Sequence, residues 1–356
     1  MRERKVLVLL SMLVSSVLAG CLLRPINERG TIYTPAPTRA VTAEPSEPPL
    51  EEWQGLFIPK QCVRGVPRGW AGNTLKAISS SGQWIAYVAS LEINYHFSIY
   101  NLLTGEWRTP AAPFAFNAVK WGTDDRGLYH LSLYDHDKKP EERKLWWINL
   151  ETMQAKEIRD CPHCVEFDVL ETESILAATR GIKRGWLQID MVGWTEPFTA
   201  AVTIDSVKRG GVGPISLSPH GKRLAYSAET KDKGIRQFPM RIQELGSGAI
   251  VTLTENSMPD AWLTDDVILD PDPEAMRVWR HNLVTGERVV FAEVDRDLSS
   301  VYAIGQGSPY TGIRGVAIAR DTRFLLFEPL RETSIWTGTI FVADLRCSRR
   351  VSAEQR

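Results

Sequence analysis

Two short sequence patterns alternate along this chain, and the length of their repeat constrains the fold more than any other feature. The first pattern is a polar turn followed by a short apolar strand. Its three clearest copies, residues 79–87, 218–226 and 319–327, align without gaps. Counting weaker copies, the pattern recurs six times at spacings of 44 to 57 residues, near positions 84, 128, 175, 223, 267 and 324. A repeat of this length predicts one supersecondary unit used many times.

The second pattern is a strand that ends in Asn-Leu and runs into a tight turn. Residues 101–106 (NLLTGE) match residues 282–287 (NLVTGE), and residues 149–152 form a partial third copy. The glycine of the pattern supplies the positive φ that hairpin turns require. Because the two patterns alternate, each unit of the repeat is predicted to contain four β-strands.

The strands themselves exclude a helical repeat. Segments such as 146–148 (WWI) and 339–342 (TIFV) are rich in aromatic and β-branched residues and alternate with turn glycines. Together the two patterns resemble those of the TolB-like, WD-related β-propellers over nearly all of residues 74–345. The resemblance implies an all-β fold, a single β-propeller of six four-stranded blades. We place this domain at residues 54–350 and a short tail at 351–356.

The final unit of the repeat is expected to be completed by the N-terminal end of the domain. Three strands are predicted in it, at 313–318, 323–328 and 339–345, and little sequence follows for a fourth. Residues 55–59 (GLFIP) precede the first unit and are predicted to supply that outer strand. Pairing the two chain ends in this way removes an open sheet edge, which is how propellers close.

The N-terminal segment is built like an export signal. A basic start at residues 2–5 (RERK) precedes residues 6–19, an uninterrupted run of apolar and small residues. This run of 14 residues is shorter than the ~20 that a spanning helix needs, so it predicts a cleaved signal peptide. The Leu-Ala-Gly-Cys at 18–21 resembles the lipobox of bacterial lipoproteins, which implies cleavage after residue 20 and a diacylglycerol on the Cys21 thiol. The alternative is an ordinary signal peptide cleaved near Ala19.

A lipid on Cys21 would hold the mature chain at a membrane, because two or more acyl chains give stable anchoring. The expected location is the extracytoplasmic side of the cell envelope. Leu22, in place of an aspartate at the second mature position, favours the outer membrane or the cell surface. Residues 21–53 contain six prolines and no periodic apolar pattern. They predict a disordered, semi-extended tether, with a partly ordered arm on the domain as the alternative.

Four further cysteines in an exported protein predict two disulfides, for which three pairings exist. Cys62 and Cys347 flank the two chain ends that ring closure brings together, so we expect them to pair. Cys161 then pairs with Cys164. The first bond would close a loop of nearly the whole domain, worth about 4 to 5 kcal/mol in the chain-entropy treatment.

The segment Cys161-Pro162-His163-Cys164 is identical to the active-site tetrapeptide of Dsb-type thiol oxidoreductases. In that family a helix N-terminus lowers the pKa of the first cysteine. Here apolar and polar residues alternate over 165–170 as in a strand, and no thioredoxin-type βαβ pattern surrounds the motif. A structural disulfide is therefore expected, with redox activity or metal binding as the alternatives. Two thiolates and one histidine are too few for a closed zinc site.

No motif of a catalytic, nucleotide-binding or metal site stands out. The nucleophile elbow, the His-Glu-x-x-His helix and the phosphate-binding glycine loop are missing from the sequence. Ser308 lacks the second glycine of an elbow and is assigned to a plain loop. Asp270, Asp272 and Glu274 lack the glycine and the downstream glutamate of a calcium loop and are assigned to a solvated turn. We predict no catalytic residue, no cofactor and no metal.

Propeller geometry favours one face for binding. The loops between the second and third strands of a blade, and those between blades, open on the face where the resemblance implies that ligands bind. The alternative is that the mixed charges of these loops are only solvated surface. The candidate residues on this face are Asp135, His136, Asp137, His163, Lys231, Asp232, Tyr310 and Arg331.

Charge narrows the choice of function. A net charge of −1 leaves no basic footprint for nucleic acid. Because no catalytic motif is found, we expect a non-catalytic module that is held at the membrane through Cys21 and binds an envelope protein or polysaccharide. One alternative is a hydrolase or lyase whose acid and base groups converge at the propeller axis from different blades. The other is a thiol oxidoreductase that uses Cys161 and Cys164.

Overall fold

The computed structural model describes most of the chain between Pro48 and Glu354. The described residues are 48–66, 73–79, 81–91, 94–108, 116–122, 124–132, 140–183, 186–208, 215–227, 230–232, 235–237, 239–253, 261–298, 310–319, 323–331 and 340–354. They belong to a compact unit that spans Pro48–Arg356. This unit includes residues 48–53, which the sequence assigned to the tether.

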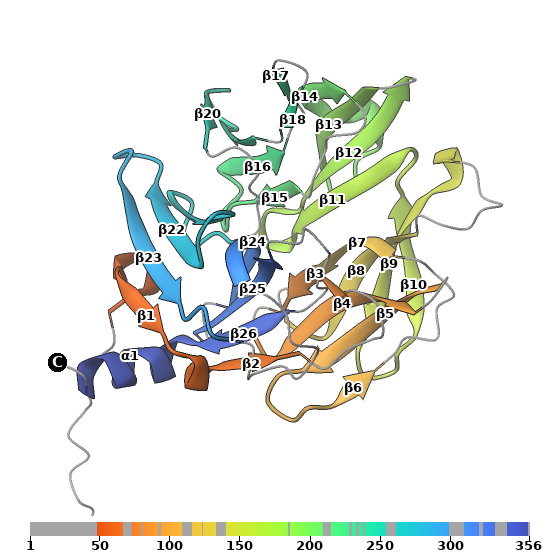
Figure 1. Ribbon diagram of the computed structural model, residues 1–356. Coiled ribbons are helices and arrows are strands. Elements are labelled where there is room, and N and C mark those ends of the chain that lie inside the picture. The colour runs from red at the N-terminus through yellow and green to blue at the C-terminus, as the bar shows by residue number, and fades with distance from the viewer. Residues whose placement is uncertain are drawn as a thin grey trace, which may run out of the picture. The chain divides into compact units, whose positions relative to one another are not determined.

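Six four-stranded sheets form the blades of a β-propeller, as the repeat predicted (Figure 1). Blade 1 consists of β3 (Asn73–Ile78), β4 (Trp84–Leu91), β5 (Asn94–Asn101) and β6 (Trp107–Arg108), and blade 2 of β7 (Phe116–Trp121), β8 (Gly127–Ser132), β9 (Lys144–Asn149) and β10 (Ala155–Asp160). Blade 3 consists of β11 (Cys164–Leu170), β12 (Ile175–Lys183), β13 (Trp186–Gly193) and β14 (Val202–Lys208).

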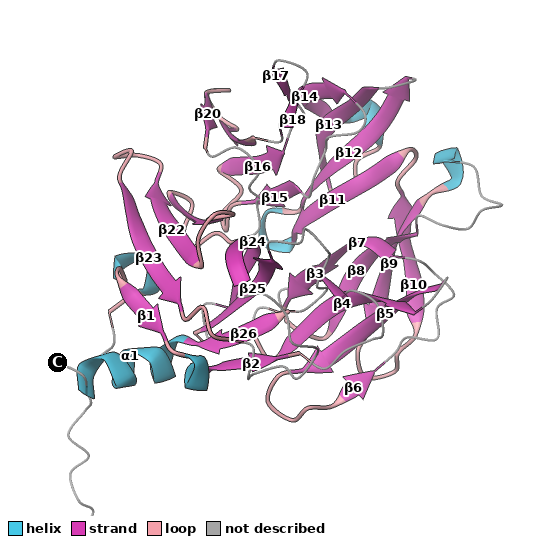
Figure 2. Cartoon of the chain, in the orientation of Figure 1, coloured by secondary structure: helices cyan, strands magenta, loops and turns pink. Residues whose placement is uncertain are grey.

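The second half of the ring adds a hairpin to this plan and takes two outer strands from the N-terminal end of the domain. Blade 4 consists of β15 (Ile215–Leu217), β16 (Arg223–Ser227), β19 (Met240–Glu244) and β20 (Ile250–Thr252), with a separate hairpin of β17 (Thr230–Asp232) and β18 (Ile235–Gln237). Blade 5 consists of β21 (Val267–Pro271), β22 (Arg277–Asn282), β23 (Arg288–Val294) and β1 (Leu56–Ile58), and blade 6 of β24 (Tyr310–Ala319), β25 (Phe324–Arg331), β26 (Phe341–Asp344) and β2 (Val63–Gly65). In the described part of the chain, α1 (Leu345–Glu354) is the single α-helix, and the rest is strand, short 3-10 turn and loop (Figure 2).

The Asn-Leu pattern builds the tight turn between two consecutive strands of a blade, the third and fourth in blades 1 and 2, and β22 and β23 in blade 5. In blade 1, Asn101 Oδ1 accepts hydrogen bonds from the backbone amides of Leu103 and Thr104, each at 2.9 Å. Asn149 makes the same pair of bonds in blade 2, and so does Asn282 in blade 5. An asparagine side chain that replaces backbone partners in this way fixes a tight turn, which explains why the residue recurs.

The pattern of a polar turn followed by an apolar strand builds the turn before the second strand of a blade and connects neighbouring blades. In blade 4, Ser218 Oγ accepts a hydrogen bond from the amide of Arg223 at 3.0 Å, which closes the turn onto its strand. The amide of His220, in the same turn, donates to Asp265 of blade 5 at 2.9 Å. The turn between β3 and β4 bonds to blade 2 in the equivalent way. The repeated sequence therefore determines both the blade and its contact with the next one.

The two chain ends meet differently from the expectation. Residues 48–66, here called the closing segment, contain two short strands. β1 runs parallel to β23 on the outside of blade 5, and β2 runs antiparallel to β26 as the fourth strand of blade 6. The prediction that residues 55–59 complete the last blade is therefore wrong, because Val63–Gly65 fills that position.

Apolar alternation explains why β1 packs with one face buried. Leu56 and Ile58 are buried while Phe57 between them is 43% exposed, so the strand presents two apolar side chains to the core shared by blades 5 and 6. Residues 261–263 already line the other edge of blade 5, where Leu269 N donates to Ala261 O at 2.8 Å. β1 therefore extends this blade outward, and the 3-10 turn η2 (Lys60–Cys62) carries the chain on to blade 6.

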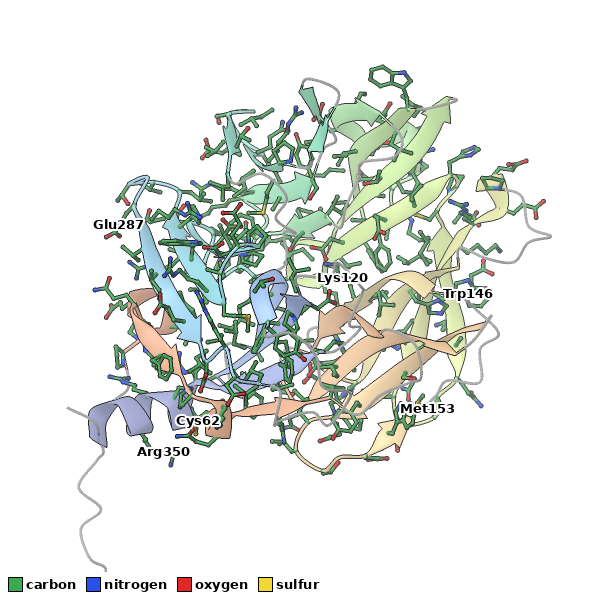
Figure 3. The ribbon with its side chains drawn as sticks, in the orientation of Figure 1. Cys62, Lys120, Trp146, Met153, Glu287 and Arg350 are labelled. Atoms are coloured by element: carbon green, nitrogen blue, oxygen red, sulfur yellow. A yellow bond between two sulfur atoms is a disulfide. The ribbon has the colours of Figure 1, made fainter. Side chains whose placement is uncertain are left out.

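The closing segment is held by burial in the core and by contacts with the C-terminal helix. Leu50 and Trp53 lie in the core, and the indole of Trp53 lies 5.4 Å from the guanidinium of Arg323 and 5.0 Å from that of Arg349. Figure 3 shows Cys62 close to α1, which carries Arg350. Helix α1 extends beyond the boundary predicted at residue 350.

Across the described residues, no helix has the length and apolarity needed to cross a membrane.

The structure joins the cysteines in two pairs. Cys62 and Cys347, 285 residues apart in sequence, have their sulfur atoms 1.93 Å apart, which connects the closing segment to α1. Cys161 and Cys164 have their sulfur atoms 2.13 Å apart. The first pair is positioned by ring closure, and the second lies in the connection from blade 2 to blade 3.

Candidate functional site

A groove of about 790 Å³ lies where the outer part of blade 2 meets blade 3. Blade 2 contributes the end of β10, and the connection to blade 3 contributes the disulfide loop. Blade 3 contributes β12 and the connection between β13 and β14, which contains the 3-10 turn η5 (Phe198–Ala200). The lining residues are Ile158, Arg159, Asp160, Pro162, Arg180, Trp194, Thr195, Glu196, Pro197, Phe198 and Thr199.

The apolar lining of the groove continues the core between the two blades. Ile158, Trp194 and Phe198 are partly buried and pack against the cluster formed by residues such as Leu131 of blade 2 and Leu176 of blade 3. The Trp194 ring meets that of Tyr129 edge-on, with centroids 5.2 Å apart. The aromatic surface of the groove is therefore supported from behind and needs no rearrangement to be presented.

Arg159 connects two parts of the groove wall, one from blade 2 and one from blade 3. Its guanidinium donates to the carbonyl oxygens of Gly193 at 3.2 Å, Trp194 at 2.7 Å and Glu196 at 2.6 Å. These bonds connect the outer strand of blade 2 to the β13–β14 connection of blade 3. Burial lowers the pKa of Arg159 and the charge of Asp160 opposes that shift. An arginine nevertheless stays protonated in proteins.

Arg180 forms the other cationic part of the lining. Its Nε donates to Pro162 O at 3.0 Å and its Nη1 donates to Asp190 Oδ2 at 3.2 Å. Asp190 is fully buried, and its second oxygen accepts from Gln188 at 2.6 Å and from Thr203 at 3.1 Å. A buried carboxylate with this many partners holds the guanidinium in one orientation.

The ring of Phe198 contacts both arginines. The guanidinium carbon of Arg180 is 4.4 Å from the ring centroid, and that of Arg159 is 5.0 Å from it. Both distances are within the range of cation–π attraction. The groove therefore contains two fixed positive charges on one aromatic ring, beside the partly exposed ring of Trp194.

The disulfide loop forms one end of the groove and is itself rigid. His163 adopts a left-handed backbone conformation with a φ of 61°. Its amide donates to Pro140 O at 2.7 Å and its carbonyl accepts from Gly181 N at 2.9 Å. The side chain of Arg143 donates to the carbonyl of Cys164. Pro162 is thereby fixed where its carbonyl can accept from Arg180.

The two cysteines of this loop are fully buried. Thiol exchange requires an accessible sulfur, as the reactive cysteines of oxidoreductases have. The motif also leads directly into β11, whereas the oxidoreductase tetrapeptide opens a helix. The surroundings are those of a structural disulfide.

The residues proposed for the binding face have different surroundings. Asp135, His136 and Asp137 lie outside the described residues, as does Cys21. Lys231 and Asp232 lie in β17, and Arg331 ends β25. His163 is partly buried next to the groove, while Tyr310 is 3% exposed and its ring meets that of Phe341 edge-on with centroids 5.6 Å apart. Tyr310 is therefore a core residue, because the first residue of β24 faces inward.

An ion pair crosses the inner strands of blades 2 to 4. Lys120 of β7 lies 3.6 Å from Asp168 of β11, which also accepts a 2.6 Å hydrogen bond from the amide of Leu217 in β15. Figure 3 shows Lys120 at the centre of the view, between the blades. Burial raises the pKa of Asp168, and Lys120 and the amide bonds oppose this shift. These bonds connect three blades, a structural role that needs no ligand.

The acidic residues at the end of β21 and just after it do not form a calcium loop. Asp270 is fully buried and lies 3.2 Å from Nε2 of His281, while Asp272 accepts from the indole of Trp279 at 3.1 Å. Within the described ranges, no three His, Cys, Asp or Glu side chains come together as metal ligands would.

Sequence reasoning missed the groove. Its side chains come from residues 158–160, 162, 180 and 194–199, which share no motif and lie on β10, β12, η5 and the loops beside them. The signal within the sequence is the Trp194 to Phe198 segment, where two aromatic residues interrupt a polar connection. Only the fold brings Arg159 and Arg180 to the same ring.

Several solved structures of other proteins are similar to this chain at low sequence identity. No family model matches the chain, and no curated protein matches it in sequence. TolB from Acinetobacter baumannii matches with a TM-score of 0.48 and 16% identity over 62% of this chain and 54% of that one, so the match spans about half the length of that protein. Regucalcin, a calcium-binding protein from Agrobacterium tumefaciens, matches with a TM-score of 0.48 and 12% identity over 81% of this chain and 95% of that one.

A third solved structure, a protein of unknown function from Bacteroides thetaiotaomicron, has a TM-score of 0.51 and 9% identity over 82% of this chain and 75% of that one. At such identities the similarity concerns the β-propeller fold alone. The function must be argued from the groove.

Proposed function

We propose that this protein is a lipid-anchored, extracytoplasmic β-propeller that binds a protein segment or an envelope polymer without catalysis, and that the groove between blades 2 and 3 is its binding site. The observation that carries the proposal is the groove itself. It combines a volume of about 790 Å³ with a supported aromatic surface and a fixed guanidinium. Concave, largely preformed sites with a few placed polar groups are typical of ligand binding.

The polar groups of the groove favour binding over chemistry. Arg159 and Arg180 stay protonated, so neither is suited to accept a proton as a general base. Glu196 accepts a hydrogen bond from the amide of Gly193 at 3.2 Å, and Asp160 is exposed and lies 3.9 Å from Lys144. Burial against the aromatic rings would supply the affinity, and the guanidinium would supply specificity.

The membrane anchor in this proposal is the lipid on Cys21, with the proline-rich residues up to 47 as a tether. Support comes from the lipobox-like residues 18–21 and the preceding apolar run. Metabolic labelling with a fatty acid should tag the wild-type protein and leave a Cys21→Ser variant untagged. A labelled Cys21→Ser protein would show that the anchor is not at this residue.

The binding role is tested by retention of envelope material on the immobilised full-length protein. The wild type should retain a protein or glycan that Trp194→Ala loses, because the substitution removes the largest apolar surface of the groove. Trp107→Ala is the matched control, since Trp107 is half exposed on the outer strand of blade 1. Equal retention by all three proteins, or by none, would contradict binding through the groove.

A further inference from the structure

We infer that the ligand of this groove carries one free carboxylate on an apolar or aromatic body, and that Arg180 recognises the carboxylate. The inference rests on the proposed function, because it names the ligand class of the same groove.

Arg180 presents donors that the fold leaves for a ligand. A guanidinium has five N–H groups. Within the described part of the chain, the Arg180 guanidinium makes two hydrogen bonds, from Nε to Pro162 and from Nη1 to Asp190. Its side chain is 18% exposed and lines the groove. Three N–H groups remain, one on Nη1 and two on Nη2, and a carboxylate can accept two of them in parallel.

The orientation of Arg180 is set before any ligand arrives. Asp190 holds one nitrogen, Pro162 holds another, and the ring of Phe198 covers one face of the guanidinium. Asp190 is itself immobilised by Gln188 and Thr203. A side chain fixed in this way loses little further conformational freedom on binding, so the new hydrogen bonds contribute fully to affinity.

Arg159 differs from Arg180 in this respect. Its bonds to Gly193, Trp194 and Glu196 direct the guanidinium at backbone carbonyls of the groove wall. Arg159 is therefore a positioning residue for the wall, and Arg180 is the residue that faces the ligand.

The charge around the groove disfavours a ligand with more than one negative charge. Asp190 already pairs with Arg180, and among the lining residues Arg159 and Arg180 are balanced by Asp160 and Glu196. A dianionic phosphate would meet these two carboxylates, whereas one carboxylate needs one guanidinium edge. The rest of the lining is apolar and suits an aromatic or aliphatic body, with Ile158, Pro162, Trp194, Pro197 and Phe198 as its surface.

The test compares two probes that differ only in the acid group, N-acetyl-tryptophan and N-acetyl-tryptophanamide. Their dissociation constants for the full-length protein are measured by ligand-observed NMR. We expect the acid to bind about five- to tenfold more tightly, because a hydrogen bond to a charged group is stronger than one to a neutral group.

Two variants locate the effect. Arg180→Lys keeps the positive charge beside Asp190 but removes the planar edge, and it should raise the dissociation constant of the acid to that of the amide. Arg277→Lys is the matched control, because Arg277 also pairs with a carboxylate, Glu293 at 2.8 Å, and also lies on an aromatic ring, Trp279 at 5.1 Å, but belongs to blade 5. It should leave both constants unchanged.

Each result decides a different claim. If the two probes bind equally and Trp194→Ala abolishes both, the groove binds ligands but the carboxylate inference is wrong. If the acid is preferred and Arg180→Lys has no effect, the assignment to Arg180 is wrong. If neither probe binds, the ligand class is wrong, and retention of envelope material decides separately whether the groove has a binding role.

Discussion

The closing segment and the groove each contain a disulfide, yet the two bonds constrain the molecule very differently. Cys62 and Cys347 are separated by 285 residues, and Cys161 and Cys164 by 3. In the chain-entropy treatment the long loop is worth about 5 kcal/mol and the short loop about 2 kcal/mol. The first bond therefore stabilises the ring as a whole, whereas the second fixes the local geometry at one end of the groove.

The polar groups of the two regions also differ in whether their hydrogen bonds are made within the fold. In the closing segment, the Trp53 indole donates to Pro48 O at 3.1 Å, and Arg280 donates to the carbonyl of Glu51. These donors make their hydrogen bonds within the fold. In the groove, Arg180 keeps an edge of its guanidinium at the surface. A region that closes the fold uses its contacts internally, and a region that binds a ligand keeps some available.

Removing the long-range disulfide should produce the largest effect on stability. The double variant Cys62→Ser and Cys347→Ser should lose about 5 kcal/mol of unfolding free energy, because the unfolded chain regains the entropy of the open loop. Chemical denaturation of the wild type and the variant measures this. A loss no larger than that of the Cys161→Ser and Cys164→Ser pair would contradict the difference drawn between the two regions.

A smaller loss should follow when the core contact of β1 is removed. Ile58 is fully buried, so Ile58→Ala should cost about 2 to 5 kcal/mol in unfolding free energy. Phe57→Ala, in the same strand, changes a side chain that is 43% exposed and should cost well under that. Urea denaturation compares the two. Equal losses would show that β1 does not pack as a buried strand.

The sequence predicts the blades well because each is specified locally. Asn101, Asn282 and Ser218 form the turns that their spacing indicated. The ends of the chain are specified by contacts that no local pattern contains. Residues 55–59 have the alternation of a strand, but whether such a strand joins blade 5 or blade 6 depends on where η2 turns the chain.

The groove is less predictable for the same physical reason. Arg180 belongs to a strand whose pattern indicates only β structure, and its partner Asp190 is ten residues away on the next strand. The proposed face residue Tyr310 shows the opposite error, since a residue in a long connection was assigned to the surface and is buried. Pairing between strands, which sets these side-chain directions, is not contained in a linear motif.

Acid should destabilise the blade that carries one wall of the groove. Burial lowers the pKa of His130 in β8 to about 3 from its ordinary 6.5. Below pH 6.5 the unfolded chain therefore takes up a proton that the folded protein does not. The free energy of unfolding should fall by about 1.4 kcal/mol per pH unit as the pH is lowered from 6.5 toward 3. Above pH 6.5 the stabilising contribution of His130 is complete.

The variant His130→Phe isolates this contribution. The raised pKa of Asp168 acts with the opposite sign, since its stabilisation is lost as pH rises, but Asp168 is present in both proteins. Urea denaturation between pH 7 and 5 should show a shallower slope for the variant. Identical slopes would mean that His130 does not remain neutral in the folded protein.

The groove disulfide is expected to stabilise the fold much less than the bond between Cys62 and Cys347 does. Cys161→Ser with Cys164→Ser should cost about 2 kcal/mol of unfolding free energy, in keeping with its short loop. The same change should weaken binding to the groove, because Pro162 would no longer hold Arg180 in one orientation. Denaturation and the NMR probe experiment measure the two effects. Unchanged binding would show that the loop does not position Arg180.

The most direct measurement of the central claim is photo-crosslinking in intact cells. A photoreactive amino acid is placed at Thr195, an exposed residue of the groove, and, in a second protein, at Trp107 on the outer strand of blade 1. Binding through the groove predicts a crosslinked adduct from position 195 that is absent from position 107. Adducts from position 107 alone, or equal adducts from both positions, would contradict it.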